Sequence, residues 1–554
     1  IAIIVALKPT SRPKKINDYF LYERNLSPSG FVKTSVGYSM QVVSIFLFLL
    51  WTLEYGAISF LIPLSWCFGY FLMGWAVSRK LLDDFLVTSD LDEIRTIHGF
   101  IGSKVNRGRL FLVSLMAIFT IFGLGGTLVA EMDYVTLFIS QVLGFGQGGF
   151  TPYLIHMVIL IFTVFYVLWG GYRAVVETDK FQVPLSYISF AIILFAIFYY
   201  NALLGNVNHS RILTILCILI FFVILRNRIT LSKLESDYPI LRDKILLSII
   251  LIIGLITLLF TFGKENTTPI TWIGFFKENN HLFGFGLFGI ISLFIANSIW
   301  QFVDISSLQR LQSVEYSSEQ DSKLSTHSRI IIKQGLFSAG IESAIIWILA
   351  IFLALGLHFA GIQGYDDLSN FFMSLGGVFW WILPLFVFAM ISFMLSSIDG
   401  FISAISYVTY YDVLRQQEVK DNKDQRHLLA RITTFFSVFI IYTLYIFLKE
   451  GPAAQHIAAI LYVVYAVQIS IACVIIITLL KPKYINVSAA ILSILSGGVV
   501  SWWTATTYDT PFKWIPLDSW YVIPPLAVFI FSTFTYIIVY YSSSILRKLN
   551  IKGI

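Results

Sequence analysis

The chain has 554 residues, of which 57% are hydrophobic and only 13% are charged, and its mean hydropathy is +0.79. This composition excludes an ordinary water-soluble fold, which would have too little polar surface to cover itself. The net charge of +6 does not indicate a nucleic-acid partner, because the basic residues flank apolar segments and no basic cluster alternates with exposed aromatic residues.

Fourteen apolar stretches are each long enough to cross a bilayer, which takes about 20 residues. We predict spans near 34–55, 57–78, 110–134, 152–170, 183–204, 211–226, 245–263, 281–303, 334–358, 376–411, 432–448, 454–480, 486–505 and 520–542. Residues 1–7 resemble the end of one more span. Most of the 38 lysines and arginines fall in alternate connecting segments, including the loop 226–244, so the positive-inside rule places these segments in the cytoplasm. We expect a multi-pass protein of the plasma membrane, with a bacterial inner membrane as the favoured location.

The connecting segments are too short to hold a soluble domain, and no phosphate-binding loop of the G-x-x-x-x-G-K-[ST] type occurs. One G-x-G-x-x-G pattern begins at Gly284, but it lies at a membrane span and favours helix packing over dinucleotide binding. The three cysteines, Cys67, Cys217 and Cys473, lie in apolar spans, which argues against a disulfide framework or a zinc site. No nucleophile–base pair or metal cluster stands out, so we do not expect an enzyme.

Polar side chains within lipid are tolerated only where they face protein or a water-filled pathway, and they therefore identify candidate functional positions. Ser396 and Ser397 precede Asp399 in an apolar helix, with Asp399 about 20 Å from the expected helix end. The hydroxyls could simply bond to the carbonyl four residues earlier, but the nearby carboxylate favours an ion pathway. The segment 169–182 carries Asp179; it could be a tight turn with snorkelling charges.

Two acidic residues have open interpretations. Glu342 lies about 13 Å into its span, where an interhelical hydrogen bond and a substrate or proton role are about equally favoured. Glu131 is about 33 Å from Arg109 along its helix, which predicts a solvated vestibule at the far interface. The candidate substrate contacts are Met40, Asn297, Trp300, Gln301 and Glu342.

Four segments in order resemble motifs of the sodium/solute symporter family, which includes sodium-glucose, sodium-proline and sodium-sialic acid cotransporters. They are NDYFLYERNLSPSG from residue 17, WGGYRAVVETDKFQ from residue 169, WQFVDISSLQRLQSVE from residue 300 and SSIDGFISAISYVTYYDVLR from residue 396. The resemblance covers most of residues 17–415 and rests on the order and spacing of the four motifs together.

The resemblance implies an all-α membrane protein whose transporter core is a pair of inverted five-helix repeats (LeuT-like), with additional helices. It places the end of a preceding helix and a cytoplasmic lead-in at 1–33, the first repeat at 34–204, the second at 281–480, and two accessory helices at 481–554. The family pattern does not include a transmembrane hairpin at 205–280. We interpret this insertion as peripheral or as a site for a partner protein.

The resemblance also implies the sites. The main sodium ion would bind the carbonyls of Tyr38, Gln41 and Phe393 and the hydroxyls of Ser396 and Ser397, because hard oxygen ligands replace the hydration shell of an alkali cation. Asp179 and Asp399 would form a second cation or proton site. The family's first core helix is usually glycine-rich around its break, whereas this chain has no glycine between Gly37 and the end of that span.

The sequence therefore predicts sodium-coupled symport of a small solute by alternating access. Two alternatives stay open: a transporter-like membrane sensor or partner-regulated scaffold, and a proton-coupled carrier on the same fold. The expected partners are the solute, the sodium ion and the lipid bilayer.

Overall fold

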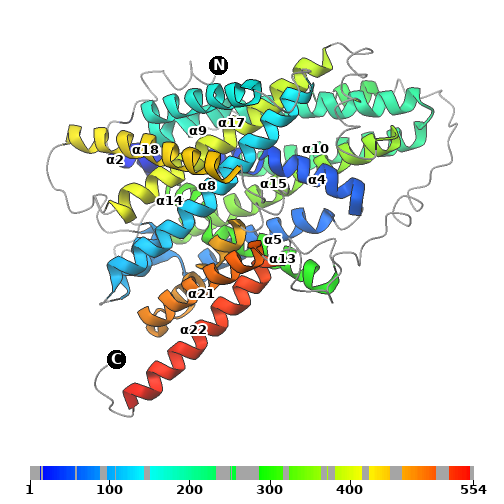
Figure 1. The fold of residues 1–554 in the computed structure, drawn as a ribbon. Helices are drawn as coiled ribbons and strands as arrows, with labels where there is room; N and C mark the ends of the chain where they lie inside the picture. Colours follow the sequence, from blue (N-terminus) through cyan, green and yellow to red (C-terminus); the bar gives the residue numbers. More distant parts are fainter. Residues whose placement is uncertain are drawn as a thin grey trace.

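The structure is a computed structural model that describes most of the chain as helices (Figure 1). The described residues are 13, 16–55, 59–87, 96–105, 108–142, 150–232, 250, 252–257, 286–315, 324–362, 371, 381–414, 423–449, 464–506 and 523–548. Within them, pairing between extended segments is limited to one isolated bridge, between Leu26 and Val314. Predictions on residues 1–7, on the loop 233–244 and on most of the expected span 245–263 lie outside the described residues.

The helices follow the chain from the N-terminal lead-in to a C-terminal pair. In order they are α2 (Ile16–Leu21), η2 (Tyr22–Arg24), α3 (Pro28–Ser39), α4 (Val42–Tyr55), α5 (Leu61–Ser78), α6 (Asp83–Leu86), α7 (Ile97–Ser103), α8 (Arg109–Val142), α9 (Phe150–Leu203), α10 (Val207–Ser232), α13 (Gly286–Val303), α14 (Ile305–Gln312), α15 (Thr326–Phe359), α17 (Ile382–Val408), η5 (Thr409–Val413), α18 (Lys423–Lys449), α20 (Ala472–Leu480), η8 (Pro482–Tyr484), α21 (Val487–Thr506) and α22 (Pro524–Lys548).

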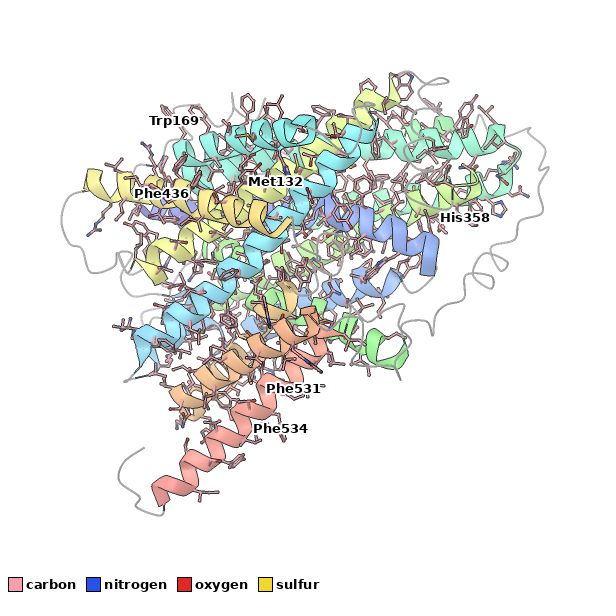
Figure 2. All side chains as sticks on the ribbon, viewed as in Figure 1. Met132, Trp169, His358, Phe436, Phe531 and Phe534 are labelled. Atoms are coloured by element: carbon pink, nitrogen blue, oxygen red, sulfur yellow. The ribbon has the colours of Figure 1, made fainter. Side chains whose placement is uncertain are left out.

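Eight helices in the described part of the chain are long and apolar enough to cross a membrane, or ten if each of two bent pairs forms one span. Large apolar side chains cover the outside of the bundle, as lipid contact requires. Phe436 on α18 and Phe531 and Phe534 on α22 are each more than half exposed (Figure 2). The chain is a multi-pass membrane protein.

The first bent pair is α3 and α4, which meet at 57° across Met40 and Gln41. The expected broken helix is therefore present even though no glycine lies at the break. Side chains from other helices supply the missing hydrogen bonds: Trp347 Nε1 of α15 donates to the Ser39 carbonyl at 2.7 Å, and a carboxylate from α8 accepts from the start of α4. Such external partners let a helix break inside a membrane protein.

The second bent pair is α13 and α14, which meet at 44°. Asp304 caps α14, because its carboxylate accepts hydrogen bonds from the backbone N–H groups of Ser306 and Ser307 at 3.0 and 3.2 Å. The two bent pairs fall at the starts of the two expected repeats.

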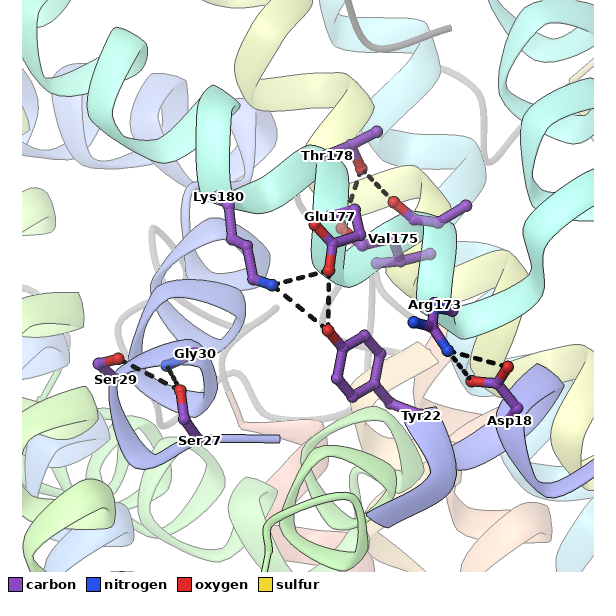
Figure 3. Close-up of polar contacts among 11 residues, drawn as sticks. Asp18, Tyr22, Ser27, Ser29, Gly30, Arg173, Val175, Glu177, Thr178 and Lys180 are labelled. Atoms are coloured by element: carbon purple, nitrogen blue, oxygen red, sulfur yellow. Dashed lines mark hydrogen bonds and ion pairs between the residues drawn. The ribbon is translucent and has the colours of Figure 1, made fainter. Parts of the chain in front are cut away.

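The N-terminal lead-in packs on the middle of α9, near its sharp bend (Figure 3). Arg173 Nη1 donates to both oxygens of Asp18 at 3.0 Å, and Tyr22 donates to Glu177 at 2.8 Å. Lys180 donates to the same Glu177 oxygen at 2.7 Å. The segment 169–182 is therefore a helix bend held by the lead-in, rather than a free turn.

Gly171 makes that bend, with φ 58° and ψ −150°, a backbone conformation essentially restricted to glycine. A methyl group there would also collide with the Tyr19 carbonyl. We expect Gly171→Ala to lower the free energy of unfolding by about 2 kcal/mol or more, measured as a lower Tm in detergent. Gly361→Ala is the matched control, because Gly361 has φ +88° with nothing within 4 Å of an added Cβ. Equal losses in the two variants would contradict the Tyr19 contact.

Helix α10, which begins the expected insertion, is joined to α15 by a buried ion pair. Arg228 Nη2 donates to Glu342 Oε2 at 2.6 Å, and Asn227 donates to Glu342 Oε1 at 2.8 Å. Glu342 is fully buried and the Arg228 side chain is 6% exposed. The interhelical bond that was one of the two interpretations of Glu342 is therefore present.

Replacing one member of this pair leaves a buried charge without its partner, whereas replacing both members with apolar residues leaves no buried charge to compensate. We expect Arg228→Met to cost roughly 3 kcal/mol of stability and Arg228→Met with Glu342→Met to restore most of the loss. Thermal unfolding of the two single variants and the double variant measures the coupling. Additive losses would show that the two side chains act independently.

Candidate functional site

The paired serines lie in the middle of α17, buried and turned toward two carboxylates. Ser396 Oγ donates a short hydrogen bond to Asp179 Oδ1 of α9. Ser397 Oγ donates to Glu131 Oε1 of α8 at 2.7 Å, and also lies 3.3 and 3.0 Å from the carbonyl oxygens of Phe393 and Met394. The hydroxyls thus do more than bond back to their own helix.

The end of α3 approaches the same serines. A Cβ added to Gly37 would collide with Ser396 Oγ and would lie 3.0 Å from Asp179 Oδ1. Gly37 therefore lets the backbone just before the helix break come within direct reach of α9 and α17. The predicted main sodium site would require this placement, and coordination by the Tyr38, Gln41 and Phe393 carbonyls stays a prediction.

Asp399 lies one turn beyond the serines and also faces α9. Its Oδ2 accepts a hydrogen bond from the Tyr166 hydroxyl at 2.7 Å and lies 3.4 Å from Thr178 Oγ1. Asp399 Oδ1 and Asp179 Oδ2 are both buried without a hydrogen-bond partner. Each carboxylate therefore keeps one oxygen available for a cation or a proton.

Glu131 is not in an outer vestibule, and that prediction is wrong. Its side chain is fully buried, and so is that of its neighbour Met132. A depth measured from Arg109 assumes that the membrane begins there, but α8 has 34 residues and is about 50 Å long. A helix of that length exceeds the roughly 30 Å hydrocarbon core, and Glu131 is followed by eleven more helical residues.

The Glu131 carboxylate bonds to the first two residues of α4. Val42 N donates to Oε1 at 2.6 Å and Val43 N donates to Oε2 at 2.8 Å. With the Ser397 hydroxyl, the carboxylate accepts three hydrogen bonds from two other elements. Glu131 thus joins the broken first helix to the paired-serine helix.

Arg310 of α14 supplies a buried positive charge next to Gly400, one turn beyond Ser396 on α17. Its Nε donates to the Thr34 carbonyl at 3.2 Å, and its guanidinium lies over the Tyr38 ring at 4.5 Å. A Cβ on Gly400 would lie 2.7 Å from Nη2, so α17 and α14 touch at this point. Arg310 interacts electrostatically with Asp179 and Asp399.

Carboxylates outnumber this guanidinium. Asp179, Asp304 and Asp399 are all fully buried, and Arg310 is the basic side chain that acts on each of them. Isolated buried charge is strongly unfavourable, so buried carboxylates bind cations or protons. The geometry suits a monovalent cation held by hydroxyl and carboxylate oxygens.

The predicted substrate residues occupy different surroundings. Met40 is buried at the helix break, and Trp300 stacks against Tyr465 with ring centroids 4.1 Å apart. Gln301 is fully buried with neither polar side-chain atom hydrogen-bonded, whereas Asn297 Nδ2 donates to the Leu293 carbonyl of its own helix. Of these, Gln301 is the most available for a solute, and Glu342 lies against Arg228. Their substrate roles stay predictions.

Sequence reasoning did not identify Arg310, Tyr166 or Trp347 as members of this region. Arg310 lies in one of the four family-like segments, so its charge within a buried motif was a usable signal. Tyr166 and Trp347 are aromatic residues among many others, and only their hydrogen bonds distinguish them.

No family model matches the chain, and no curated protein sequence is similar to it. The fold is similar to a solved structure described as the substrate-bound outward-open state of a Na+-coupled sialic acid symporter. The match has a TM-score of 0.59 and 13% identity, and it covers 97% of this chain and 95% of that one. At this identity the likeness establishes the fold, and it confirms the predicted all-α, LeuT-like membrane architecture.

Proposed function

We propose that the protein is a sodium-coupled symporter of a small solute that works by alternating access. The observation that supports this most directly is the meeting of the paired serines of α17 with Asp179 and with the end of α3 beside the helix break. Discontinuous helices near the membrane midplane are where carriers of this fold bind ions and solutes. The similar solved structure is described as a Na+-coupled symporter, which supports the same coupling ion.

The proposed main sodium site uses Ser396 and Ser397 with the carbonyls of Tyr38, Gln41 and Phe393. A second cation or proton site lies between Asp179 and Asp399, whose free oxygens both need a positive partner. The two sites adjoin each other, because Ser396 of the first bonds to Asp179 of the second. Occupation of one site therefore changes the charge that faces the other.

We further propose that α3 to α9 form the first inverted repeat and that the second begins at α13. The two bent pairs would then be the discontinuous helices that open each repeat. Helix α10 lies between the repeats and is fixed to α15 through Arg228 and Glu342. This position fits an accessory role, and a partner protein at 205–280 remains a proposal.

The test is thermal unfolding of the purified protein in sodium chloride, with potassium and N-methylglucamine chlorides as controls at equal ionic strength. A ligand that binds only the folded state raises its Tm in a saturable manner. We expect a rise with sodium alone, followed by sodium-dependent uptake of any solute that adds to it. Equal unfolding temperatures in the three salts at every pH would contradict sodium coupling.

A proton-coupled carrier is the second candidate, favoured by the excess of buried carboxylates over the single guanidinium near them. Such a carrier would accumulate solute in proteoliposomes under an imposed proton gradient without sodium. Uptake that needs sodium even when a proton gradient is present would argue against it.

A further inference from the structure

The start of α4 lies beside a set of hydrogen-bond donors that already donate to one side chain of the protein. We define the α4 cradle as the backbone N–H groups of Val42 and Val43 together with the Ser397 hydroxyl. These three groups donate to the two oxygens of Glu131 at 2.6, 2.8 and 2.7 Å. The cradle is fully buried, and α4 continues for 14 residues behind it.

These donors suit an anion. Backbone N–H groups at a helix start have no partner within the helix and lie at the positive end of its dipole. In carriers of this fold, half-helix starts near the midplane face the anionic groups of substrates. Here Glu131, on a different helix, occupies that position with its carboxylate and takes up all three donors.

No lysine, arginine or histidine in the described part of the chain forms an ion pair with Glu131. The carboxylate is instead held by the cradle donors. A second carboxylate brought by a solute would find these donors occupied and would meet a like charge in a buried setting, which is strongly unfavourable.

We propose that Glu131 serves as a built-in anion that stands in for a solute carboxylate, so that the transported solute is neutral or cationic where it meets the helix break. This inference rests on the proposed transport function and narrows its substrate class. It also separates the chain from the similar solved symporter, because sialic acid itself carries a carboxylate.

The first test is chemical rescue in the purified full-length protein. Glu131→Ala empties the cradle, and we expect millimolar acetate or formate to raise the Tm of this variant in a saturable way. Wild type should show no such rise, because its cradle is filled. Asp133→Asn is the matched control, since it removes a carboxylate two positions along α8 that makes none of the three cradle bonds. Absence of rescue in Glu131→Ala would overturn the proposal.

The second test uses wild type alone and decides the question even if the variant does not fold. Solutes are compared in pairs that differ in one carboxylate: proline with prolinamide, glucuronate with glucose, glycine betaine with choline, and sialic acid with its methyl ester. We expect stabilisation from the members without the carboxylate, with apparent affinity for the carboxylate members at least about tenfold weaker. Stabilisation by the carboxylate members alone, or by no member, would overturn the proposal.

The same samples distinguish this inference from the function on which it rests. Sodium is titrated against wild type in the absence of solute. Acetate rescue of Glu131→Ala without any effect of sodium would support the built-in anion and contradict sodium coupling. A sodium effect without acetate rescue, or with stabilisation by the carboxylate solutes alone, would support sodium-coupled symport and contradict the built-in anion.

Discussion

Replacing Ser396 and Ser397 together with alanine should lower the affinity for sodium by about two orders of magnitude or more. The change removes both side-chain hydroxyl oxygens from the proposed site, whose other ligands are the carbonyls of Tyr38, Gln41 and Phe393. A hydrogen bond to a charged group contributes about 1.5–3 kcal/mol, and we take a hydroxyl contact with the sodium ion to be of similar strength. Loss of two such contacts therefore lowers the binding free energy by about 3 kcal/mol or more. Sodium titration followed by thermal unfolding, or by sodium-dependent uptake once a solute is known, measures the loss.

Ser392→Ala is the matched control for this variant. Ser392 lies one turn before Ser396 on α17, is also buried, and is 3.3 Å from the Ser186 hydroxyl rather than near either carboxylate. It should leave sodium affinity close to that of wild type, because its hydroxyl contacts Ser186 rather than Asp179 or Glu131. If the double alanine variant binds sodium as tightly as Ser392→Ala, the paired serines are not ligands.

The membrane spans could be predicted because each depends on a local property, about 20 apolar residues in a row. The helices α5, α8, α10, α15, α17, α18, α21 and α22 all overlap the expected spans. Their lengths could not be predicted as well. Helix α15 begins eight residues before its expected span, at Thr326, because polar residues extend the helix beyond the hydrocarbon core without changing the hydropathy signal.

The error over Glu131 has the same origin. A residue's depth follows from its sequence position only if the helix begins at the membrane boundary and crosses without extra length. Helix α8 has extra length, since it continues for eleven residues after Glu131. Its partners, Val42, Val43 and Ser397, come from two other helices, and a single sequence contains no signal that joins them.

The break in the first helix shows how tertiary contacts override local sequence. Glycine is the usual means of interrupting a helix, and its absence between Met40 and Tyr55 favours a continuous helix. Here Trp347 satisfies the Ser39 carbonyl and Glu131 satisfies the N–H groups of Val42 and Val43. The break therefore depends on α8 and α15, whereas the approach of Asp179 to the helix that carries Asp399 was expected from the family-like segments.

Sodium binding should weaken steeply as the pH falls, because a proton and a sodium ion compete for the same carboxylate oxygens. Asp179 and Asp399 each keep one buried oxygen without a hydrogen-bond partner. A sodium ion between them favours the ionised form of both groups, and a proton on either one removes a ligand and a charge. Where one proton must leave for each ion bound, the apparent Kd rises about tenfold for each unit of falling pH.

Asp399→Asn should flatten this pH dependence, since an amide cannot be protonated in this range, and Asp399→Ser should do so while leaving a neutral oxygen. Glu342→Gln is the matched control: Glu342 is equally buried, but it bonds to Arg228 and Asn227 instead of facing Asp179. Sodium titrations at several pH values compare the three variants with wild type.

If sodium has no effect at any pH while Glu342→Gln abolishes uptake driven by a proton gradient, the coupling ion is the proton and its carrier is the pair between α10 and α15. If Asp399→Asn alone flattens the profile, the cation site lies between α9 and α17, where the two free carboxylate oxygens are.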